Sequence, residues 1–502
     1  MQTAEPAAPE AAVVARRGRR VTRLAPGGVL ILLLLAGVWA LVELRINVAT
    51  LIDGAGNAAA FLRRVWPLDV PPLGEIVNET AMTLSVVLLA TLMAVVLSLP
   101  LAVWAARNTR RGRASHGVAR LVIVIARVVP DVILAIVFVR FFGLGALPGV
   151  LAMGLHSVGM VAKLYAEAIE QIDHGPVEAL RAVGASRGQQ LASGVLPQVL
   201  PALVAVGLHR FDINLRVSAI LGYVGVAGIG MEMAEAFAGL RFSRGIAWAV
   251  VLIVLCVLAE WLSGALRRTL LRDTDTLSRH DRHTLRALAR RMGLGTPPDG
   301  VGASSGGRIS PRWTVRRVRR WTGVVTLVAV ALWAFLFSDV SQAELNGGLG
   351  AVATTLGQFW PPSFGGAASQ LWDALGVTIQ IGLGATLIGV TLALPAGSLA
   401  ARNVSPNQTV HRLFRGFVMA IRGLPELVLA VVLVVVVGLG PVAGTLALGV
   451  GAIGLLGKLV ADSLEEVDPG PAEALRAVGA SRMQIYFAAT LPQGARAMVG
   501  NT

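Results

Sequence analysis

The stretch Gly175-Pro-Val-Glu-Ala-Leu-Arg-Ala-Val-Gly-Ala-Ser-Arg187 returns near the end of the chain as Gly470-Pro-Ala-Glu-Ala-Leu-Arg-Ala-Val-Gly-Ala-Ser-Arg482. Only one of the 13 positions differs, and the offset between the two stretches is 295 residues (470 minus 175). Self-similarity at a fixed offset indicates a duplicated structural unit. The same offset pairs Pro100 with Pro395, Arg107 with Arg402, Pro130 with Pro425, Lys163 with Lys458, and Pro197 with Pro492. The chain therefore contains two homologous copies of one unit.

The composition places both copies in a membrane. Of the 502 residues, 55% are hydrophobic and 15% are charged, whereas soluble domains carry about a quarter charged residues. Windows such as 80–106 and 374–401 contain no charge and are longer than the roughly 20 residues that cross a bilayer. The lone cysteine, Cys256, excludes a disulfide scaffold. The sequence predicts an all-α polytopic membrane protein.

The formal charge of +15 is concentrated between the apolar spans, which is the positive-inside pattern of membrane proteins. It predicts a cytoplasmic N-terminus and makes nucleic-acid binding a minor interpretation, so we expect no nucleic-acid partner. The predicted organisation is a basic cytoplasmic tail (1–26), a first half (27–267), a basic cytoplasmic linker (268–320) and a second half (321–502). The predicted spans are 27–46, 80–104, 127–145, 147–169, 197–222 and 245–267 in the first half, and 321–338, 374–400, 424–441 and 443–465 in the second.

The second half stops early by this alignment. Thr502 matches Gly207, so the counterparts of residues 208–267, which hold the last two helices, are absent. A half without these helices would leave polar faces against lipid. We therefore expect this sequence to be part of a longer chain.

The repeated stretch has the pattern of a short exposed helix. Helix-forming residues run from Glu178 to Val183, Gly184 lets the chain reverse, Ser186 can cap the next helix, and Pro197 opens the following span. A short helix between two spans suits docking into the groove of a partner. The alternative is an ordinary loop kept by recent duplication, which is disfavoured because the rest of the two copies has diverged far more.

This spacing resembles the EAA loop of ABC-importer permeases. The stretches Pro425-Glu-Leu-Val-Leu-Ala and Arg210-Phe-Asp-Ile-Asn-Leu-Arg resemble the phosphonate permeases of that superfamily, although Leu180 and Leu475 replace the second alanine of the motif. The resemblance implies a type I importer permease fold in a bacterial inner membrane, with two halves of about six transmembrane helices each. It also implies coupling helices that dock on the ATPases at Glu178, Ala179, Gly184, Ala185, Glu473, Ala474, Gly479 and Ala480.

The partners implied by the resemblance are a dimer of cytoplasmic ABC ATPases and an extracytoplasmic phosphonate-binding protein. The chain has no G-x-x-x-x-G-K-[ST] motif, because Gly457-Lys458 is followed by Leu459 within a predicted span. We therefore expect a transport subunit without catalytic residues, metal site or cofactor, with ATP and magnesium bound by the partner ATPases.

Charges within the spans mark a candidate substrate path, since they are costly at membrane depth. At helical spacing, Arg210 lies over Asn214, and Asp212 lies over Arg216. Two interpretations stay open: an anion path, which suits Arg210, and a structural ion pair, which suits Asp212 with Arg216. Further candidates are Arg140 and His156, whose counterparts Val435 and Gly451 are uncharged; snorkelling and a packed core histidine are the alternatives.

The leading hypothesis is an importer permease that moves phosphonate or a related phosphorus oxyanion into the cytoplasm by alternating access. An ABC permease for another small solute, such as methionine or phosphite, is the alternative. An ATP-independent secondary transporter is disfavoured, because such a carrier has no reason to keep two nearly identical loops.

Overall fold

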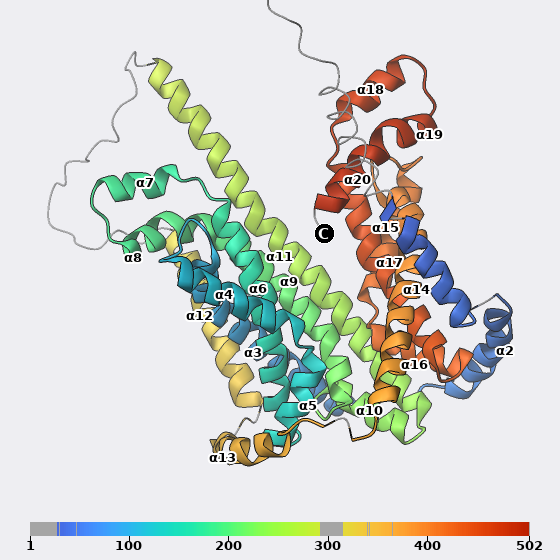
Figure 1. Ribbon diagram of the computed structural model, residues 1–502. Coiled ribbons are helices and arrows are strands. Elements are labelled where there is room, and N and C mark those ends of the chain that lie inside the picture. Colours follow the sequence, from blue (N-terminus) through green and yellow to red (C-terminus); the bar gives the residue numbers. More distant parts are fainter. Residues whose placement is uncertain are drawn as a thin grey trace, which may run out of the picture. The chain divides into compact units, whose positions relative to one another are not determined.

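The computed structural model describes residues 28–29, 31–46, 48–291, 315–338, 340, 342–363 and 365–500, and nearly all of them are helical (Figure 1). Predictions for the tail 1–26 and for the centre of the linker lie outside these ranges. The chain divides into two compact units. We call Pro67–Pro361 the central unit, and Met1–Trp66 together with Pro362–Thr502 the composite unit.

Within the described ranges, six helical stretches are long and apolar enough to cross a membrane: Leu73–Ala105 (α3), Ala146–Glu170 (α6), Arg187–Gly222, Phe242–Leu266, Ala368–Ala400 (α14) and Pro441–Glu465 (α17). The stretch Arg187–Gly222 comprises α8 (Arg187–Gln189), a π-helical segment η1 (Gln190–Val195) and α9 (Leu196–Gly222), and Phe242–Leu266 begins α11 (Phe242–Arg291). These helices confirm the multi-pass all-α architecture.

Two predicted spans, 127–145 and 424–441, are wrong as single helices. Each falls on a break between two helices that are bent by 87°. The helix pairs are α4 (Arg113–Val128) with α5 (Asp131–Phe142), and α15 (Gln408–Gly423) with α16 (Glu426–Val437). The breaks fall at Pro130 and Pro425, because proline lacks a donor and disfavours helical geometry in the residue before it. Val129 and Leu424 accordingly have extended ψ angles of 118° and 123°.

In the central unit, α3 and α6 form the core together with α4 and α9, and in the composite unit α14 packs with α15 and α17 in the same way. Glycine lets the helices approach at matched positions. A Cβ on Gly159 would lie 2.8 Å from the backbone nitrogen of Arg127, and one on Gly454 would lie 2.6 Å from that of Arg422. A larger residue at either position would push two backbones apart.

The first helix of each sequence copy packs with the other copy. The helix Ile31–Glu43 lies against α14 in the composite unit, where a Cβ on Gly37 would be 2.9 Å from Leu387 Cβ. Within the central unit, α12 (Val315–Phe337) contacts α3, and α13 (Gln342–Gln358) contacts α5. The boundaries 27–267 and 321–502 follow the repeat, whereas packing groups the helices as Pro67–Pro361 and the remainder.

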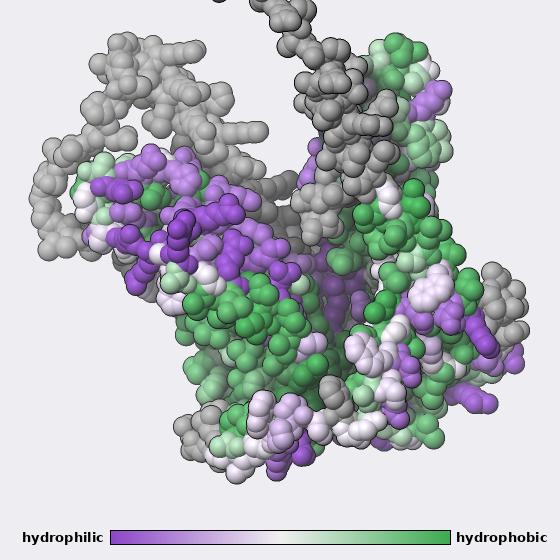
Figure 2. All heavy atoms as spheres, in the orientation of Figure 1, coloured by the Kyte–Doolittle hydropathy of each residue, from purple (hydrophilic) through white to green (hydrophobic). Residues whose placement is uncertain are grey.

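The remaining elements are shorter. They are α2 (Val48–Val65), which packs on α16, α7 (Gly175–Ala182), α10 (Ile229–Ala238), α18 (Pro469–Ala477), α19 (Arg482–Ile485), the π-helical η2 (Tyr486–Thr490) and α20 (Leu491–Gly500). Figure 2 shows that hydrophilic residues gather around α7 and α8, with hydrophobic residues over the neighbouring helices of the central unit.

Candidate functional site

The repeated stretch folds in the same way in both copies. It forms α7 and α18, as predicted, and the glycine after each helix has a positive φ angle, 78° at Gly184 and 83° at Gly479. Ser186 and Ser481 then cap the next helix, and each forms a capping box with the glutamine three residues later. The local sequence therefore determines helix, reversal and cap in each copy.

Neither α7 nor α18 buries a residue within the chain. The predicted docking residues Glu178, Ala179, Gly184, Glu473, Ala474 and Gly479 are exposed, and Ala185 and Ala480 are half-buried. Two residues that the sequence analysis missed are the valines at the tips: Val183 is 80% exposed and Val478 is 81% exposed. An apolar side chain is thus exposed at the same position of both copies.

A π-helical segment supports the first of these helices. A Cβ on Gly194 in η1 would lie 3.1 Å from Val177 and 3.2 Å from Leu180, both on α7. Gly194 therefore lets α7 pack closely on the start of the next span. The base of the loop is fixed by Gln198, whose side chain accepts from the Asp173 backbone N–H (3.0 Å) and donates to the Asp173 carbonyl (3.1 Å).

Backbone and side-chain bonds join the segment after α3 to the end of α6, and the segment after α14 to the end of α17. The Arg107 backbone N–H donates to Glu170 (2.9 Å), and that of Arg402 donates to Glu465 at the same distance. The Asn108 side chain donates to the Ile169 carbonyl (2.6 Å), and Asn403 makes the same bond to Leu464. The offset of 295 residues relates all of these groups, so a search for paired polar residues would have found them. The helices that lead into α7 and α18 are thereby bonded to the segments that follow α3 and α14.

The second part of the site is a buried polar network. Arg210 is 4% exposed, and its Nε donates to Ser157 Oγ (2.6 Å). The Ser157 hydroxyl lies 3.1 Å from the Asn214 side-chain oxygen, and Asn214 donates to Thr91 (3.1 Å). The network joins α9 to α6 and α3, and it brings together Arg210 and Asn214 as predicted.

Arg210 lacks a paired carboxylate. Among the residues that the structure describes, no acidic group lies within ion-pair distance of its guanidinium, although Asp131 on α5 acts on it electrostatically. Its other recorded partner is the sulfur of Met160, at 3.8 Å. The recorded contacts of this buried guanidinium are therefore with uncharged groups, a hydroxyl and a thioether.

Arg216 is different, because two carboxylates surround it. Its Nη2 lies 2.7 Å from Asp212 and 3.4 Å from Glu260. Asp212 and Arg216 belong to α9 and Glu260 belongs to α11. The predicted Asp212–Arg216 pair is confirmed as a contact within α9, and the contact between Arg216 and Glu260 ties α9 to α11. This geometry favours the structural interpretation for the pair.

The remaining candidates do not join the network. Arg140 is exposed in the last turn of α5, which fits snorkelling. His156 is half-buried, and its Nδ1 is 3.0 Å from the Val129 carbonyl, beside the break before Pro130. In the second copy, Gly451 replaces His156, and the Glu426 side chain lies within 3.0 Å of where its Cβ would be. His156 thus satisfies the carbonyl group at a helix break.

The sequence matches a family of membrane transport subunits at two places. The family described as binding-protein-dependent transport system inner membrane component matches residues 98–272 and again residues 393–501, which together are more than half of the chain. The chain belongs to this family. Since the family matches twice, the two copies are two permease halves fused in one chain, as the repeat indicated.

Curated relatives agree. The phosphate-import permease protein PhnE of Mycolicibacterium smegmatis is 41% identical over 455 residues, which are 90% of this chain and 78% of that protein. The phosphite transport system permease protein PtxC of Stutzerimonas stutzeri is 40% identical over 223 residues, 44% of this chain and 81% of that protein. PhnE2 of Escherichia coli, whose name refers to a cryptic phosphonate transport system, is 42% identical over 118 residues, 24% of this chain and 97% of that protein.

Proposed function

We propose that this chain is the permease of an ATP-driven importer that moves phosphonate, phosphite, phosphate or a related phosphorus oxyanion into a bacterial cytoplasm. The relatives named for phosphate and phosphite transport support the substrate class. The observation that carries the proposal in this chain is Arg210, a buried guanidinium without a paired carboxylate among the described residues. A guanidinium fork matches two oxygens of a phosphorus oxyanion.

We assign the ends that carry α7 and α18 to the cytoplasmic side, because the arginine-rich segments adjoin them. There the two helices dock on a pair of ATPase subunits, which bind ATP and magnesium. Their exposed valines and glutamates supply the contacts. The bonds between the end of α6 and the segment after α3, and between the end of α17 and the segment after α14, transmit ATPase closure to the membrane. An extracytoplasmic binding protein delivers the solute on the other side.

The test is uptake by the complex of the chain, its co-purifying ATPases and its binding protein in proteoliposomes, with 2-aminoethylphosphonate, phosphite and phosphate as probes. Arg210→Ala should lower uptake at least tenfold while the complex still assembles. Arg210→Lys should recover only part of the activity, since it keeps the charge and loses the fork. Arg140→Ala is the matched control and should transport normally.

The coupling role has a separate test. Glu178→Lys together with Glu473→Lys should abolish uptake and weaken ATPase association, while the chain still inserts in the membrane, because both side chains are exposed. Uptake that persists without any associated ATPase would support the ATP-independent carrier instead. Uptake of methionine but of no phosphorus oxyanion would replace the substrate class and leave the coupling role intact.

A further inference from the structure

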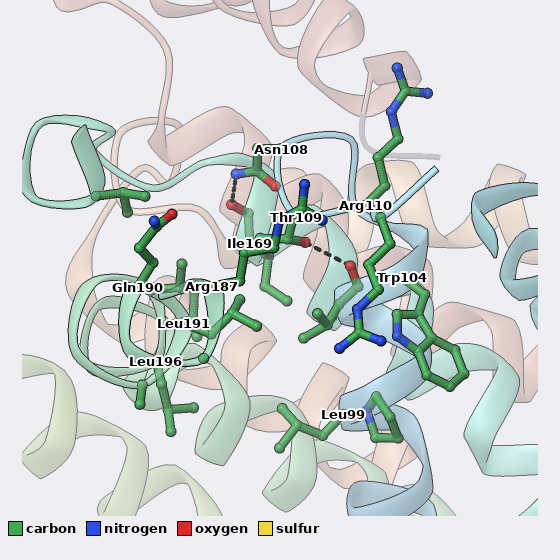
Figure 3. Close-up of a pocket in the computed structure, with 18 of the residues that line it drawn as sticks. Leu99, Trp104, Asn108, Thr109, Arg110, Ile169, Arg187, Gln190, Leu191 and Leu196 are labelled. Atoms are coloured by element: carbon green, nitrogen blue, oxygen red, sulfur yellow. Dashed lines mark hydrogen bonds between the residues drawn. The ribbon is translucent and has the colours of Figure 1, made fainter. Parts of the chain in front are cut away.

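A cavity of about 660 Å³ lies in the central unit beside α7. It is formed by the last turns of α3, the loop before α4, and the helices that follow the exposed loop (Figure 3). Figure 3 shows Leu99 and Trp104 on one side and Gln190, Leu191 and Leu196 on the other. The proposed transport function does not use this cavity.

The cavity has a strongly basic lining, with arginines on both sides (Figure 3). Four arginines line it, and none of its 19 lining residues is acidic. The arginines are Arg110, Arg111, Arg181 and Arg187. In the described part of the chain, no ion pair of these four side chains is found. Four arginines and no acidic residue in one lining favour a ligand that carries a phosphate group.

The rest of the lining is largely apolar and continues from the membrane spans. Leu99 and Trp104 come from the end of α3, whose apolar stretch closes at Ala105, and Leu196 opens α9. Trp104 is 41% exposed and Leu196 is 38% exposed. Tryptophan at the end of a span is typical of the membrane–water interface. A ligand that contacts both the arginines and the apolar residues must carry a phosphate headgroup and a hydrocarbon chain. A free phosphate ion has no hydrocarbon chain.

The second copy retains the frame of this site but not the cavity lining. By the offset, Ser405 and Pro406 replace Arg110 and Arg111, and Tyr486 replaces Leu191. The Tyr486 hydroxyl lies 2.7 Å from Ser398 Oγ, the counterpart of Val103, and so reaches across the space between the two helices. Arg482, the counterpart of Arg187, donates to the Pro406 carbonyl (2.8 Å). The second copy therefore lacks two of the arginines, and a third, Arg482, is bonded to a carbonyl group. The ring of Tyr486 lies where the first copy has Leu191.

We propose that the cavity beside α7 binds an anionic phospholipid, with its headgroup phosphate among the arginines and an acyl chain along Leu99, Trp104 and Leu196. The described counterparts in the second copy lack two of the four arginines, so the proposal applies to the first copy. The inference goes beyond the proposed transport function and rests on it only for the leaflet, which is the cytoplasmic one. A lipid bound here would contact the base of one coupling helix and not the other.

The experiment measures lipid retention by the purified full chain in detergent, by native mass spectrometry, with phosphatidylglycerol and phosphatidylcholine as probes. We expect preferential retention of phosphatidylglycerol. Arg110→Gln with Arg187→Gln should weaken it, by about fivefold for each arginine removed. The matched control in the second copy, Arg482→Gln, should leave retention unchanged.

A second variant keeps all four arginines and fills the cavity. Val103→Ser with Leu191→Tyr transfers the bridge of the second copy and should also reduce phosphatidylglycerol retention. Equal retention of both lipids, or retention unchanged in both double variants, would overturn the proposal. Loss of bound lipid on adding millimolar inorganic phosphate would identify a free-anion site instead. The variant Arg110→Gln with Arg187→Gln could instead lose the ATPases and still retain lipid. In that case the arginines form a protein-docking surface. The lipid proposal then fails, and the proposed transport function stands.

Discussion

Replacing Gly194 with alanine should loosen α7 from the membrane helices. The added Cβ would be 3.1 Å from Val177 Cγ2, 3.2 Å from Leu180 Cδ1 and 3.4 Å from Val177 Cα, so one side-chain rotation cannot relieve the crowding. Overpacking of this kind costs roughly 1–3 kcal/mol, and we take about 1–2 kcal/mol because the crowded side chains of Val177 and Leu180 are only half-buried. Alanine also gains up to about 1 kcal/mol of helix propensity, but that gain applies to η1 and not to the docking of α7.

Amide hydrogen exchange reports this loss directly, because an isolated helix as short as α7 does not persist in water. Amides of residues 178–183 should exchange about 5 to 30 times faster in Gly194→Ala, while those of 473–478 stay unchanged as an internal control. The second copy has Ala472 and buried Ala489 at the positions of Val177 and Gly194. Gly194→Ala with Val177→Ala should therefore exchange nearly as slowly as the wild type. Faster exchange in both copies, or no recovery in the double variant, would refute this packing argument.

Three further changes have defined outcomes. Val183→Ser with Val478→Ser should weaken ATPase binding at least tenfold in a pull-down and leave the unfolding temperature unchanged, because both valines are already in water. Arg216→Met should lower the free energy of unfolding by about 3 kcal/mol or more, since it leaves two carboxylates near one another. Adding Asp212→Asn should recover much of that loss. If the effects of the two substitutions simply add, the ion-pair role is contradicted. Burial and neighbouring glutamates raise the pKa of Glu232, so the folded state favours its protonated form and loses stability as pH rises. Glu232→Gln should therefore raise the unfolding temperature more at about pH 8 than at about pH 5. An equal rise at both pH values would contradict this.

The sequence was sufficient for features that depend on local chemistry. Glu178 to Val183 formed a helix, Gly184 reversed the chain and Ser186 capped the next helix, because each of these follows from propensity and backbone freedom at one position. The Asp212–Arg216 contact followed from helical spacing alone. Charge and hydropathy located the membrane helices, since lipid imposes one length and one composition on all of them.

Hydropathy failed where a break lay within an apolar run. The window 127–145 averaged two helices together, although Pro130 was a visible signal for the 87° bend. The exchange of the first helices between copies had no local signal, because Gly37 packs on Leu387, a residue 350 positions away (387 minus 37). The cavity beside α7 was missed for a similar reason: its walls come from α3 and from α9, and only the fold brings them together.

The pattern of identity between the two copies supports selection by an external partner. In a duplicated unit, internal packing constrains buried residues, while exposed loops are free to vary. Here the order is reversed: the exposed helices α7 and α18 share all but one residue, and the membrane helices around them have diverged. The one difference, Val177 against Ala472, falls on the inner face and is compensated by Gly194 against Ala489. Nothing within the chain requires Val183 and Val478 to match, since both are in water. A pair of identical partner subunits, each docking on one helix as proposed above, would account for the match.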